Sequence, residues 1–327
     1  MNRTKLSPFI HGDDNVNMIH FDLLVGVIPL IIISVVQQGL RVLVMCAISA
    51  AVAFVVETLG NFIKGKFSLA PFRVAILGVC TTLLCPITVP VWLPAIGVAF
   101  SVLFVRVILV GDFKNLFMSP AIAWLFLLTV WPNEMMTYPV YSQNNNYPIF
   151  ANVESFTSGF SMSQYLQFGQ KPPFKMLDIL TGMYPGAIGT TCIAAIFIIT
   201  IYFLFRRSIA WQVPLSMICT VSVFALIYNR ANVSPLYSVI YELSASSFIY
   251  VAIFIAGDLI NAPKLPLSRI LFGVGMGVVT MLLRYFGLYE HAVVFSLVLV
   301  NLVSGLLDKF TLYLRIFREQ RLKKLIQ

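Results

Sequence analysis

Two apolar stretches near the start of the chain decide the fold. Residues 22–38 read DLLVGVIPLIIISVVQQ and residues 41–58 read RVLVMCAISAAVAFVVET, with only two residues between them. A helix needs about 20 mostly apolar residues to cross the hydrocarbon core of a bilayer, and somewhat fewer where it is buried among other helices. Each stretch therefore predicts a transmembrane helix.

The composition of the whole chain extends this pattern. Hydrophobic residues make up 59% of the 327 residues, charged residues only 11%, and the mean hydropathy is +0.90. A soluble domain carries about a quarter charged residues, so the composition excludes a soluble enzyme, a disordered chain and a nucleic-acid-binding protein. The net charge of +9 instead indicates basic cytoplasmic loops. The five cysteines lie in apolar stretches without a CxxC pair, and no metal site is expected.

Ten apolar stretches predict an all-α, polytopic membrane protein. They lie at residues 22–38, 41–58, 73–89, 91–110, 119–131, 187–206, 212–229, 236–257, 268–285 and 291–308. With the N-terminus in the cytoplasm, the inner segments hold sixteen basic residues and the outer segments hold five. The inner ones are Arg3, Lys5, Lys64, Lys66, Arg73, Lys114, Arg206, Arg207, Lys264, Arg269, Lys309, Arg315, Arg318, Arg321, Lys323 and Lys324. The outer ones are Arg41, Lys171, Lys175, Arg230 and Arg284. This asymmetry predicts that both termini are cytoplasmic.

The topology divides the chain into five parts. They are a cytoplasmic segment (1–21), a first membrane half (22–131), a long extracytoplasmic loop (132–186), a second membrane half (187–308) and a basic cytoplasmic tail (309–327). Long ordered loops usually carry function, which makes the outer loop the candidate site. Residues 63–78 and 260–273 both place a basic, Pro-containing loop before a span that opens with Arg. This echo favours a five-plus-five duplication, on which many transport folds are built.

Four acidic residues in or at the ends of apolar spans are candidates for a cation or proton path: Asp22, Glu57, Glu242 and Asp258. A carboxylate in lipid is costly unless it is paired or faces a cavity. The alternative to a role in ion movement is that an acid simply lies at a helix end near a basic loop. This interpretation holds for Asp308 and in part for Glu57 and Asp258. Arg106, deep in the fourth span, is expected to pair with one of these acids.

The outer loop ends in a glycine-rich stretch, GMYPGAIGTT, over residues 182–191. Glycines allow close approach to the backbone, and the free N–H groups of a helix start can hold an anion such as the phosphate of a cofactor. The candidate residues are Gly182, Pro185, Gly186 and Gly189. A plain Pro/Gly turn at the membrane surface is the alternative.

The order of short motifs along nearly the whole chain resembles the RnfD/NqrB family, membrane subunits of ion-translocating ferredoxin:NAD and NADH:quinone oxidoreductases. The length is closer to RnfD. The matching pieces are Ser7-Pro8-Phe9-Ile10 (S-P-H-I in the family), Asp22, Gly39-Leu40-Arg41, Glu57, residues 115–121 (N-P-F-N-P-A), Trp131-Pro132 with Met135, residues 182–191 (G-N-x-P-G-x-x-G-E-T), residues 257–263 (T-D-P-V-T-S-P), Gly287, Tyr289, Asn301 and Asp308. Met183 replaces the family's Asn and Thr190 replaces its Glu.

The resemblance implies an electron-transfer subunit that carries FMN near the outer face of a bacterial inner membrane, coupled to Na⁺ or H⁺ movement. In the family, a flavin transferase joins FMN by a phosphoester to the Thr of an S-G-A-T motif in the outer loop. The corresponding residues here are Ser158-Gly159-Phe160-Ser161, with Ser161 as the attachment hydroxyl and Thr157 as a second hydroxyl nearby. Aromatic residues that could stack on the flavin ring are Phe156, Phe160, Tyr165, Phe168 and Tyr184.

The implied partners are other membrane subunits of an Rnf-type complex, an extracytoplasmic flavin subunit and a cytoplasmic iron–sulfur subunit. The chain would then be one component of a translocase rather than a catalyst alone, and a second flavin is left open.

Departures from the family motif leave other interpretations open. Phe160 replaces a small Ala, Met162 replaces Pro, and Ser155 stands where the transferase motif has Asp. The chain could therefore have lost covalent flavin, and the Ser/Thr-rich loop could resemble the motif only by composition. The alternative function is a transporter or assembly scaffold with the same fold and acids. A membrane enzyme with a nucleophile has little support, because the three His residues are far apart and no G-x-S-x-G or HExxH motif occurs.

Overall fold

The computed structural model describes residues 16–63, 71–108, 118–140, 147–149, 158–231, 233–259, 262–287 and 289–326, and it confirms an all-α fold. The membrane helices of the first half are α1 (Val16–Gln38), α2 (Arg41–Ile63), α3 (Pro71–Leu84), α4 (Leu93–Ser101), which continues as the π-helix η1 (Val102–Ile108), and α5 (Ser119–Val130). Those of the second half are α9 (Ile193–Arg206), α10 (Gln212–Ile227), α11 (Pro235–Ser244), η4 (Ala245–Ser247), α12 (Phe248–Tyr250), η5 (Val251–Ala256), α13 (Pro266–Tyr285) and α14 (Ala292–Ile326).

The outer loop between the halves is partly ordered into short elements. These are α6 (Pro132–Met136), β1 (Tyr138–Pro139), β2 (Ser158–Gly159), α7 (Met162–Gln167) and α8 (Met176–Thr181). Strands β1 and β2 pair antiparallel, with Tyr138 opposite Gly159 and Pro139 opposite Ser158.

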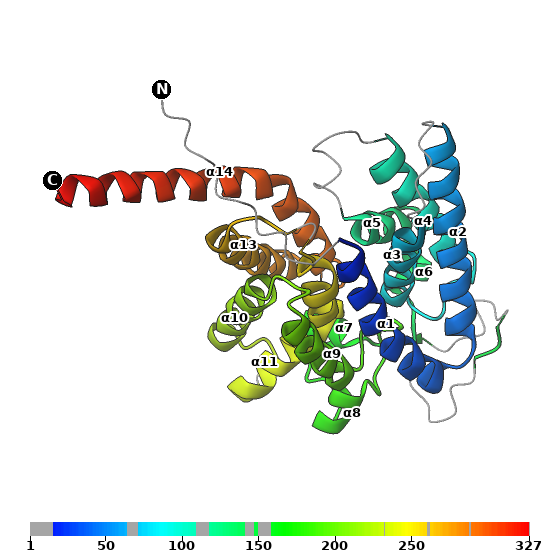
Figure 1. The fold of residues 1–327 in the computed structure, drawn as a ribbon. Helices are drawn as coiled ribbons and strands as arrows, with labels where there is room; N and C mark the ends of the chain where they lie inside the picture. The colour runs from blue at the N-terminus through cyan, green and yellow to red at the C-terminus, as the bar shows by residue number, and fades with distance from the viewer. Residues whose placement is uncertain are drawn as a thin grey trace.

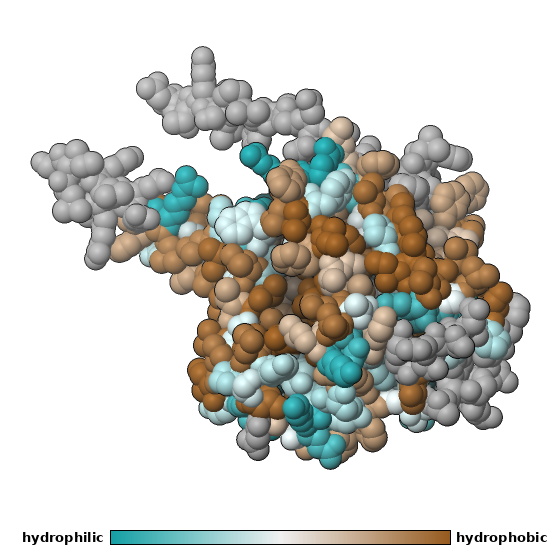
Figure 2. Space-filling model, turned by 90° about the horizontal axis from the view of Figure 1, so that it is seen from below, coloured by the Kyte–Doolittle hydropathy of each residue, from teal (hydrophilic) through white to brown (hydrophobic). Residues whose placement is uncertain are grey.

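Within the described ranges, five helical segments are long and apolar enough to cross a membrane, and five shorter apolar helices accompany them. The long ones are Met18–Gln38, Arg41–Ile63, Pro235–Ala256, Pro266–Tyr285 and Ala292–Phe317. Figure 1 shows α2, α3, α4 and α5 on one side of the molecule and α10, α11, α13 and α14 on the other. Helices α1 and α9 lie between these two groups and contact each other. Figure 2 shows hydrophobic residues gathered over the upper part and the flanks of the described surface, while paler and hydrophilic residues gather over its lower middle.

Two of the predicted spans are shorter than expected, because each gives way to buried non-helical backbone. Helix α3 ends at Leu84 rather than at residue 89, since Cys85 precedes Pro86 and proline disfavours a helical residue before it. Helix α9 begins at Ile193 rather than at residue 187. The segment before α9 donates to carbonyls at the end of α3: the Ile188 N–H donates to the Cys85 carbonyl (3.0 Å) and the Gly189 N–H to the Leu83 carbonyl (2.9 Å).

The third helix of the second half is also interrupted. Between α11 and α12 the backbone turns at Ser246 and Ser247, which both have φ of 56°. A non-glycine residue in this left-handed region costs on the order of 1–3 kcal/mol and persists only where its surroundings enforce it. The third helix of the first half thus ends early, and the third helix of the second half is interrupted. The sequence echo pairs the start of α3 with the start of α13, which are the third and ninth apolar helices. The five-plus-five repeat stays a prediction.

The last helix is longer than the predicted span. Residues 309–326, expected as a basic tail, continue α14 without a break, because no Gly or Pro follows Gly305. Figure 1 shows this end of α14 extending away from the other helices.

Helices α10 and α13 approach closely at two glycines. A Cβ atom placed on Gly273 would lie 2.5 Å from the Val213 carbonyl oxygen and would overlap Ser216 Oγ. A Cβ atom on Gly277 would lie 2.7 Å from the Thr220 Cβ. Small residues four apart on one helix face are a common way to bring two membrane helices together.

Candidate functional site

A small cavity lies where the outer loop meets the interrupted helix of the second half. It is lined by Tyr138 of β1, by Ser161, Met162 and Ser163 at the start of α7, by residues 184–187, Thr190 and Thr191 of the glycine-rich turn, by Ser244, Ser246 and Ser247 of the helix break, and by Glu290 before α14. Its volume is about 250 Å³, including its open mouth. Hydroxyl groups dominate the lining, and Glu290 is its one acidic residue.

Ser161 is fixed in this cavity by its position at the N-cap of α7. The Ser161 Oγ accepts the Gln164 N–H (3.3 Å), and the Gln164 side chain accepts the Ser161 N–H (2.9 Å), which forms a capping box. The Ser161 hydroxyl donates a hydrogen bond to the Glu290 carboxylate. Ser161 is only 3% exposed. The predicted attachment residue therefore has a defined orientation and a charged partner.

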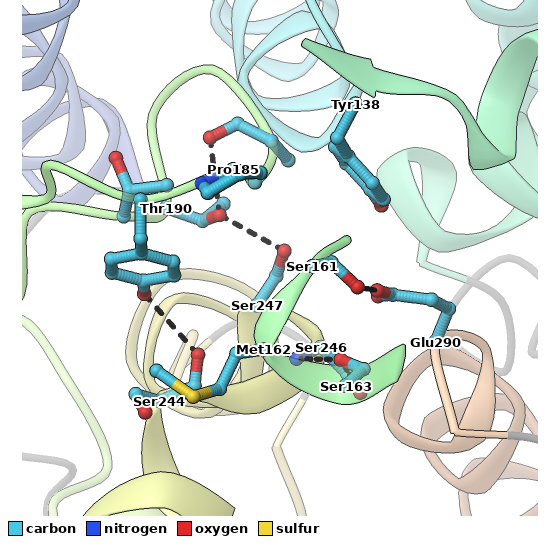
Figure 3. A pocket seen from close by; sticks show the side chains of 14 residues that line it. Tyr138, Ser161, Met162, Ser163, Pro185, Thr190, Ser244, Ser246, Ser247 and Glu290 are labelled. Atoms are coloured by element: carbon cyan, nitrogen blue, oxygen red, sulfur yellow. Dashed lines mark hydrogen bonds between the residues drawn. The ribbon is translucent and has the colours of Figure 1, made fainter. Parts of the chain in front are cut away.

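Glu290 is the charged site residue that the sequence prediction missed, along with neutral lining residues such as Tyr138 and Ser163. Burial raises the pKa of Glu290, while the hydroxyls of Ser161, Ser163 and Tyr138 and the positive charge of Arg284 act in the opposite direction. Burial and the neighbouring Glu290 together raise the pKa of Tyr138. Figure 3 shows Tyr138, Ser161 and Glu290 on one side of the cavity, with Thr190 and Ser244 on the other. The sequence feature that could have identified Glu290 is its position directly after Tyr289, at the outer end of a predicted span.

Serine side chains connect α7 to the helix break. The Ser163 Oγ accepts the Ser246 N–H (2.9 Å), and the two hydroxyl oxygens lie 3.1 Å apart. The Ser246 hydroxyl donates to the Tyr289 carbonyl, and the Ser247 hydroxyl donates to Thr190 Oγ1 (3.0 Å). These contacts hold both serines in their left-handed conformation, so the break is built into the site.

The glycine-rich turn contributes only part of its predicted residues to the cavity. Pro185 and Gly186 line it. Gly182, with φ of 85°, ends α8, and its N–H donates to the Asp178 carbonyl. The Gly189 N–H is bound to Leu83, and a Cβ at this position would overlap the Leu83 side chain. Gly182 and Gly189 thus serve the backbone turn, and their N–H groups are not available to an anion.

Strand β2 brings the rest of the predicted motif beside this turn. Gly159 packs so closely that a Cβ would lie 3.1 Å from Pro185 Cγ, whereas the Ser158 side chain is exposed. Thr157 and Phe156, which were also predicted, lie outside the described residues.

Aromatic side chains form a continuous cluster next to Ser161. Ring centroids are 5.7 Å apart for Phe160 and Tyr165, 6.3 Å for Phe160 and Phe168, 5.9 Å for Tyr165 and Phe174, and 5.8 Å for Phe174 and Tyr184. Phe160 and Phe168 are 57% and 65% exposed, so the cluster offers a flat ring an accessible face. The structure therefore brings together four of the five predicted aromatic residues and adds Phe174.

Glu242 lies in a buried ion pair rather than beside an open path. Arg284 Nη1 is 2.7 Å from Glu242 Oε2, and the two side chains are 0% and 2% exposed. The Tyr289 hydroxyl donates to the other carboxylate oxygen (3.2 Å), and Arg284 also donates to the Glu242 and Ala245 carbonyls. The sequence prediction had expected Arg106 as the partner of an acid. The Arg106 side chain lies outside the described residues, and the partner of Glu242 is Arg284.

Asp22 and Asp258 both lie beside the segment that follows α9. Asp22 accepts hydrogen bonds from the hydroxyls of Ser208 and Tyr202 and from Arg206 Nε, the last at 3.2 Å. Asp258 pairs through its backbone with Ile209, the residue after Ser208. Both acids are buried, as is Glu57 on α2. The four predicted acids therefore do not form one cluster, and their role in ion movement stays a prediction.

The apolar helices, with buried backbone interruptions meeting at a polar cavity, define a multi-pass membrane protein. The chain belongs to the NQR2, RnfD, RnfE family, whose model matches residues 3–316. It is 25% identical to the D subunit of the ion-translocating oxidoreductase complex of Haemophilus ducreyi, covering 93% of this chain and 96% of the relative. It is 26% identical to the D subunit of the Na⁺-translocating ferredoxin:NAD⁺ oxidoreductase complex of Acetobacterium woodii, over 97% and 96%. It is 24% identical to the D subunit of the proton-translocating ferredoxin:NAD⁺ oxidoreductase complex of Clostridium ljungdahlii, over 93% of each.

Proposed function

We propose that this protein is the D-type membrane subunit of an ion-translocating electron-transport complex and that it carries FMN as a phosphoester on Ser161. The full-length similarity to relatives named as D subunits of such complexes supports the first part. The observation that carries the second part is the placement of Ser161, at the same cavity as Pro185 and Gly186 and beside an exposed aromatic cluster. FMN supplies reversible electron transfer when bound, and the protein binds and orients it.

The cavity as it stands does not enclose FMN, so the proposed attachment requires the mouth beside Ser161 to open. Ligand pockets for whole drug-sized molecules are usually on the order of 300–1,000 Å³, whereas the enclosed space of this cavity, about 10 Å³, is close to that of a single water molecule. The phosphate would lie at Ser161, and the ring would stack outside the cavity on Phe160 and Phe168. Aromatic pairs of this kind are worth about 0.5–1.5 kcal/mol beyond the area they bury.

Two of the five outer basic residues are buried, and this supports the orientation with both termini in the cytoplasm. Arg41 is fully buried and donates to the carbonyls of Val89 (2.8 Å) and Pro148 (2.9 Å), and Arg284 is buried in its ion pair. The positive charge that faces solvent on the outer side is therefore smaller than the count of five outer basic residues suggests. In this proposed orientation, the cavity lies on the outer side of a bacterial inner membrane. The proposed partners are other membrane subunits, an outer flavin subunit and a cytoplasmic iron–sulfur subunit.

A second candidate function is a transporter or assembly scaffold of the same fold without covalent flavin. The observation that favours it is the burial of the Ser161 hydroxyl against Glu290, together with the large Phe160 directly before it.

The test is the intact mass and the in-gel flavin fluorescence of the denatured protein purified from its native host. We expect one FMN phosphoester per chain, lost completely in Ser161→Ala and kept in Ser161→Thr, whose hydroxyl can form the same ester. Ser234→Ala, the same change at an exposed position outside the motif and the cavity lining, is the matched control and should keep the flavin. A native protein without covalent flavin would favour the scaffold or transporter, and fluorescence that survives in Ser161→Ala would move the attachment site to another hydroxyl.

A further inference from the structure

We propose that the cavity beside Glu290 binds one dehydrated sodium ion, which links the outer loop to the interrupted helix of the second half. The ligands are oxygen atoms from three parts of the chain: the Glu290 carboxylate, the hydroxyls of Ser161, Ser163 and Ser246, and the Tyr289 carbonyl. The site belongs to the chain without flavin, so it does not depend on the attachment of FMN.

The oxygen atoms of this site form an unbroken series of contacts. The hydroxyls of Ser161 and Ser163 both donate hydrogen bonds to the Glu290 carboxylate. Ser163 Oγ lies 3.1 Å from Ser246 Oγ, and the Ser246 hydroxyl in turn donates to the Tyr289 carbonyl. The start of α7, the helix break and the segment before α14 therefore bring carboxylate, hydroxyl and carbonyl oxygens to one place. Hard cations are bound by oxygen ligands gathered in this way.

The space beside these oxygen atoms fits a small ion without its water shell. The enclosed part of the cavity has room for about one water molecule, at the lower limit of what a water needs. A hydrated ion, a phosphate group or an organic ligand is larger than this space. A bare sodium ion is smaller than a water molecule, whereas a bare potassium ion is about as large as one, so sodium fits more easily.

The charges around the cavity favour a cation over a neutral water molecule. Glu290 is acidic, and the lining holds no basic residue. The positive charge that acts on Glu290 is that of Arg284, but this guanidinium lies 2.7 Å from the Glu242 carboxylate, which it neutralises. Helix α11 ends at Ser244 in the lining, so the negative end of its dipole also lies at the cavity. A charge withdrawn from water is costly unless it is balanced, and one negative charge matches a monovalent cation.

The surroundings of Glu290 also keep its carboxyl ionised. Burial raises the pKa of Glu290, but the hydroxyls of Ser161 and Ser163 and the charge of Arg284 act in the opposite direction. Helix α14 begins at Ala292, and the N-terminal end of a helix favours a carboxylate beside it. The carboxylate is therefore available as a ligand.

A monovalent metal ion suits this set of ligands better than a divalent ion or a proton. In the part of the chain that the structure describes, no group of three or more His, Cys, Asp or Glu side chains could hold a metal ion. Divalent ions are usually bound through more than one carboxylate or through substrate phosphates. A proton would neutralise Glu290 but would bind a single oxygen atom, whereas a sodium ion contacts all the ligands at once. In membrane transport proteins, sodium is bound in this manner at unwound segments of broken helices.

Binding at this point would hold three segments of the chain together. Ser161 and Ser163 belong to the start of α7, Ser246 belongs to the helix break, and Glu290 precedes α14. An ion that binds only this closed arrangement makes open forms rarer by a factor of one plus the ratio of ion concentration to dissociation constant. At a sodium concentration ten times the dissociation constant, this factor is about eleven.

The experiment measures amide hydrogen exchange by mass spectrometry in the full-length chain in detergent micelles. The chain is made in a host without a flavin transferase, and its intact mass verifies that no FMN is attached. Exchange is compared in NaCl, KCl and choline chloride at one ionic strength and one pH. Peptides that cover α7 and residues 244–247 report on the site, and peptides that cover α2 are the internal control.

Two variants test whether Glu290 holds the ion. Glu290→Gln removes the charge at nearly unchanged size and should abolish the difference between NaCl and KCl. Glu134→Gln, the same change on the outer helix α6 and outside the cavity lining, is the matched control and should keep the difference.

We expect exchange in α7 and at the helix break to be roughly tenfold slower in NaCl than in KCl, with α2 unchanged. Equal exchange of the unmodified chain in all three salts would overturn the proposal. Equal slowing by NaCl and KCl relative to choline chloride would overturn the assignment to sodium, and a sodium effect that persists in Glu290→Gln would place the ion elsewhere. These outcomes are independent of the flavin, whose attachment is tested by the mass of the native protein.

Discussion

Replacing Arg284 by Met is expected to lower the free energy of unfolding by about 3–5 kcal/mol, since it leaves Glu242 charged and buried without its partner. The same guanidinium donates to the carbonyls of Glu242 and Ala245, so the substitution also leaves backbone acceptors at the helix break without a donor. The measurement is the midpoint of SDS-induced unfolding of the full chain in mixed micelles.

The double variant Arg284→Met with Glu242→Leu provides the stringent control. Replacing a whole buried ion pair by apolar residues is often neutral, so the double variant should recover much of the stability lost in Arg284→Met. Lys171→Met, which removes an exposed basic residue from the outer loop, should leave the midpoint unchanged. An unchanged midpoint in Arg284→Met would contradict the buried pair.

Replacing Gly273 by Ala is expected to destabilise the protein by about 1–3 kcal/mol or more, because inserted atoms in a packed interior force neighbouring groups apart. The added methyl group would meet the Val213 carbonyl oxygen at 2.5 Å, and a backbone atom cannot move aside as a side chain can. Unfolding in mixed micelles measures this effect too.

Gly305→Ala is the matched control for this prediction. Gly305 is also in a membrane helix, but nothing lies within 4 Å of a Cβ placed there. Alanine favours a helix over glycine by about 1 kcal/mol, so this variant should be unchanged or slightly more stable. Equal stability of the two variants would mean that α10 and α13 do not approach as closely as described.

The fold could be predicted from the sequence to the level of helices, because hydropathy is a local signal. The ten expected stretches coincide with ten apolar helical segments among the described residues. The interruptions were harder to predict, since a buried non-helical segment is as apolar as a helix. Ile87 and Val89 were counted as helical for this reason, although Pro86 marked the true end of α3.

The candidate site could be predicted only in part. Ser161 came from the resemblance to a family motif, and the aromatic cluster follows from residues near it in the chain. Glu290 is 129 residues away from Ser161, and no spacing rule connects the two. Arg284 was counted as an outer basic residue, because charge alone does not distinguish an exposed arginine from one buried against an acid.

The hydrogen bonds between the interrupted helices have a consequence for the synthesis of the chain. Leu83 and Cys85 belong to the first half of the chain, while Ile188 and Gly189, which satisfy their carbonyls, belong to the second. During translation, the first half enters the membrane before its hydrogen-bonding partners exist. Helix α3 has 14 residues and α9 also has 14, fewer than the roughly 20 that cross a bilayer unaided. We therefore expect these two helices to insert together, with the membrane integration of the first half completed only after the ribosome has made the second.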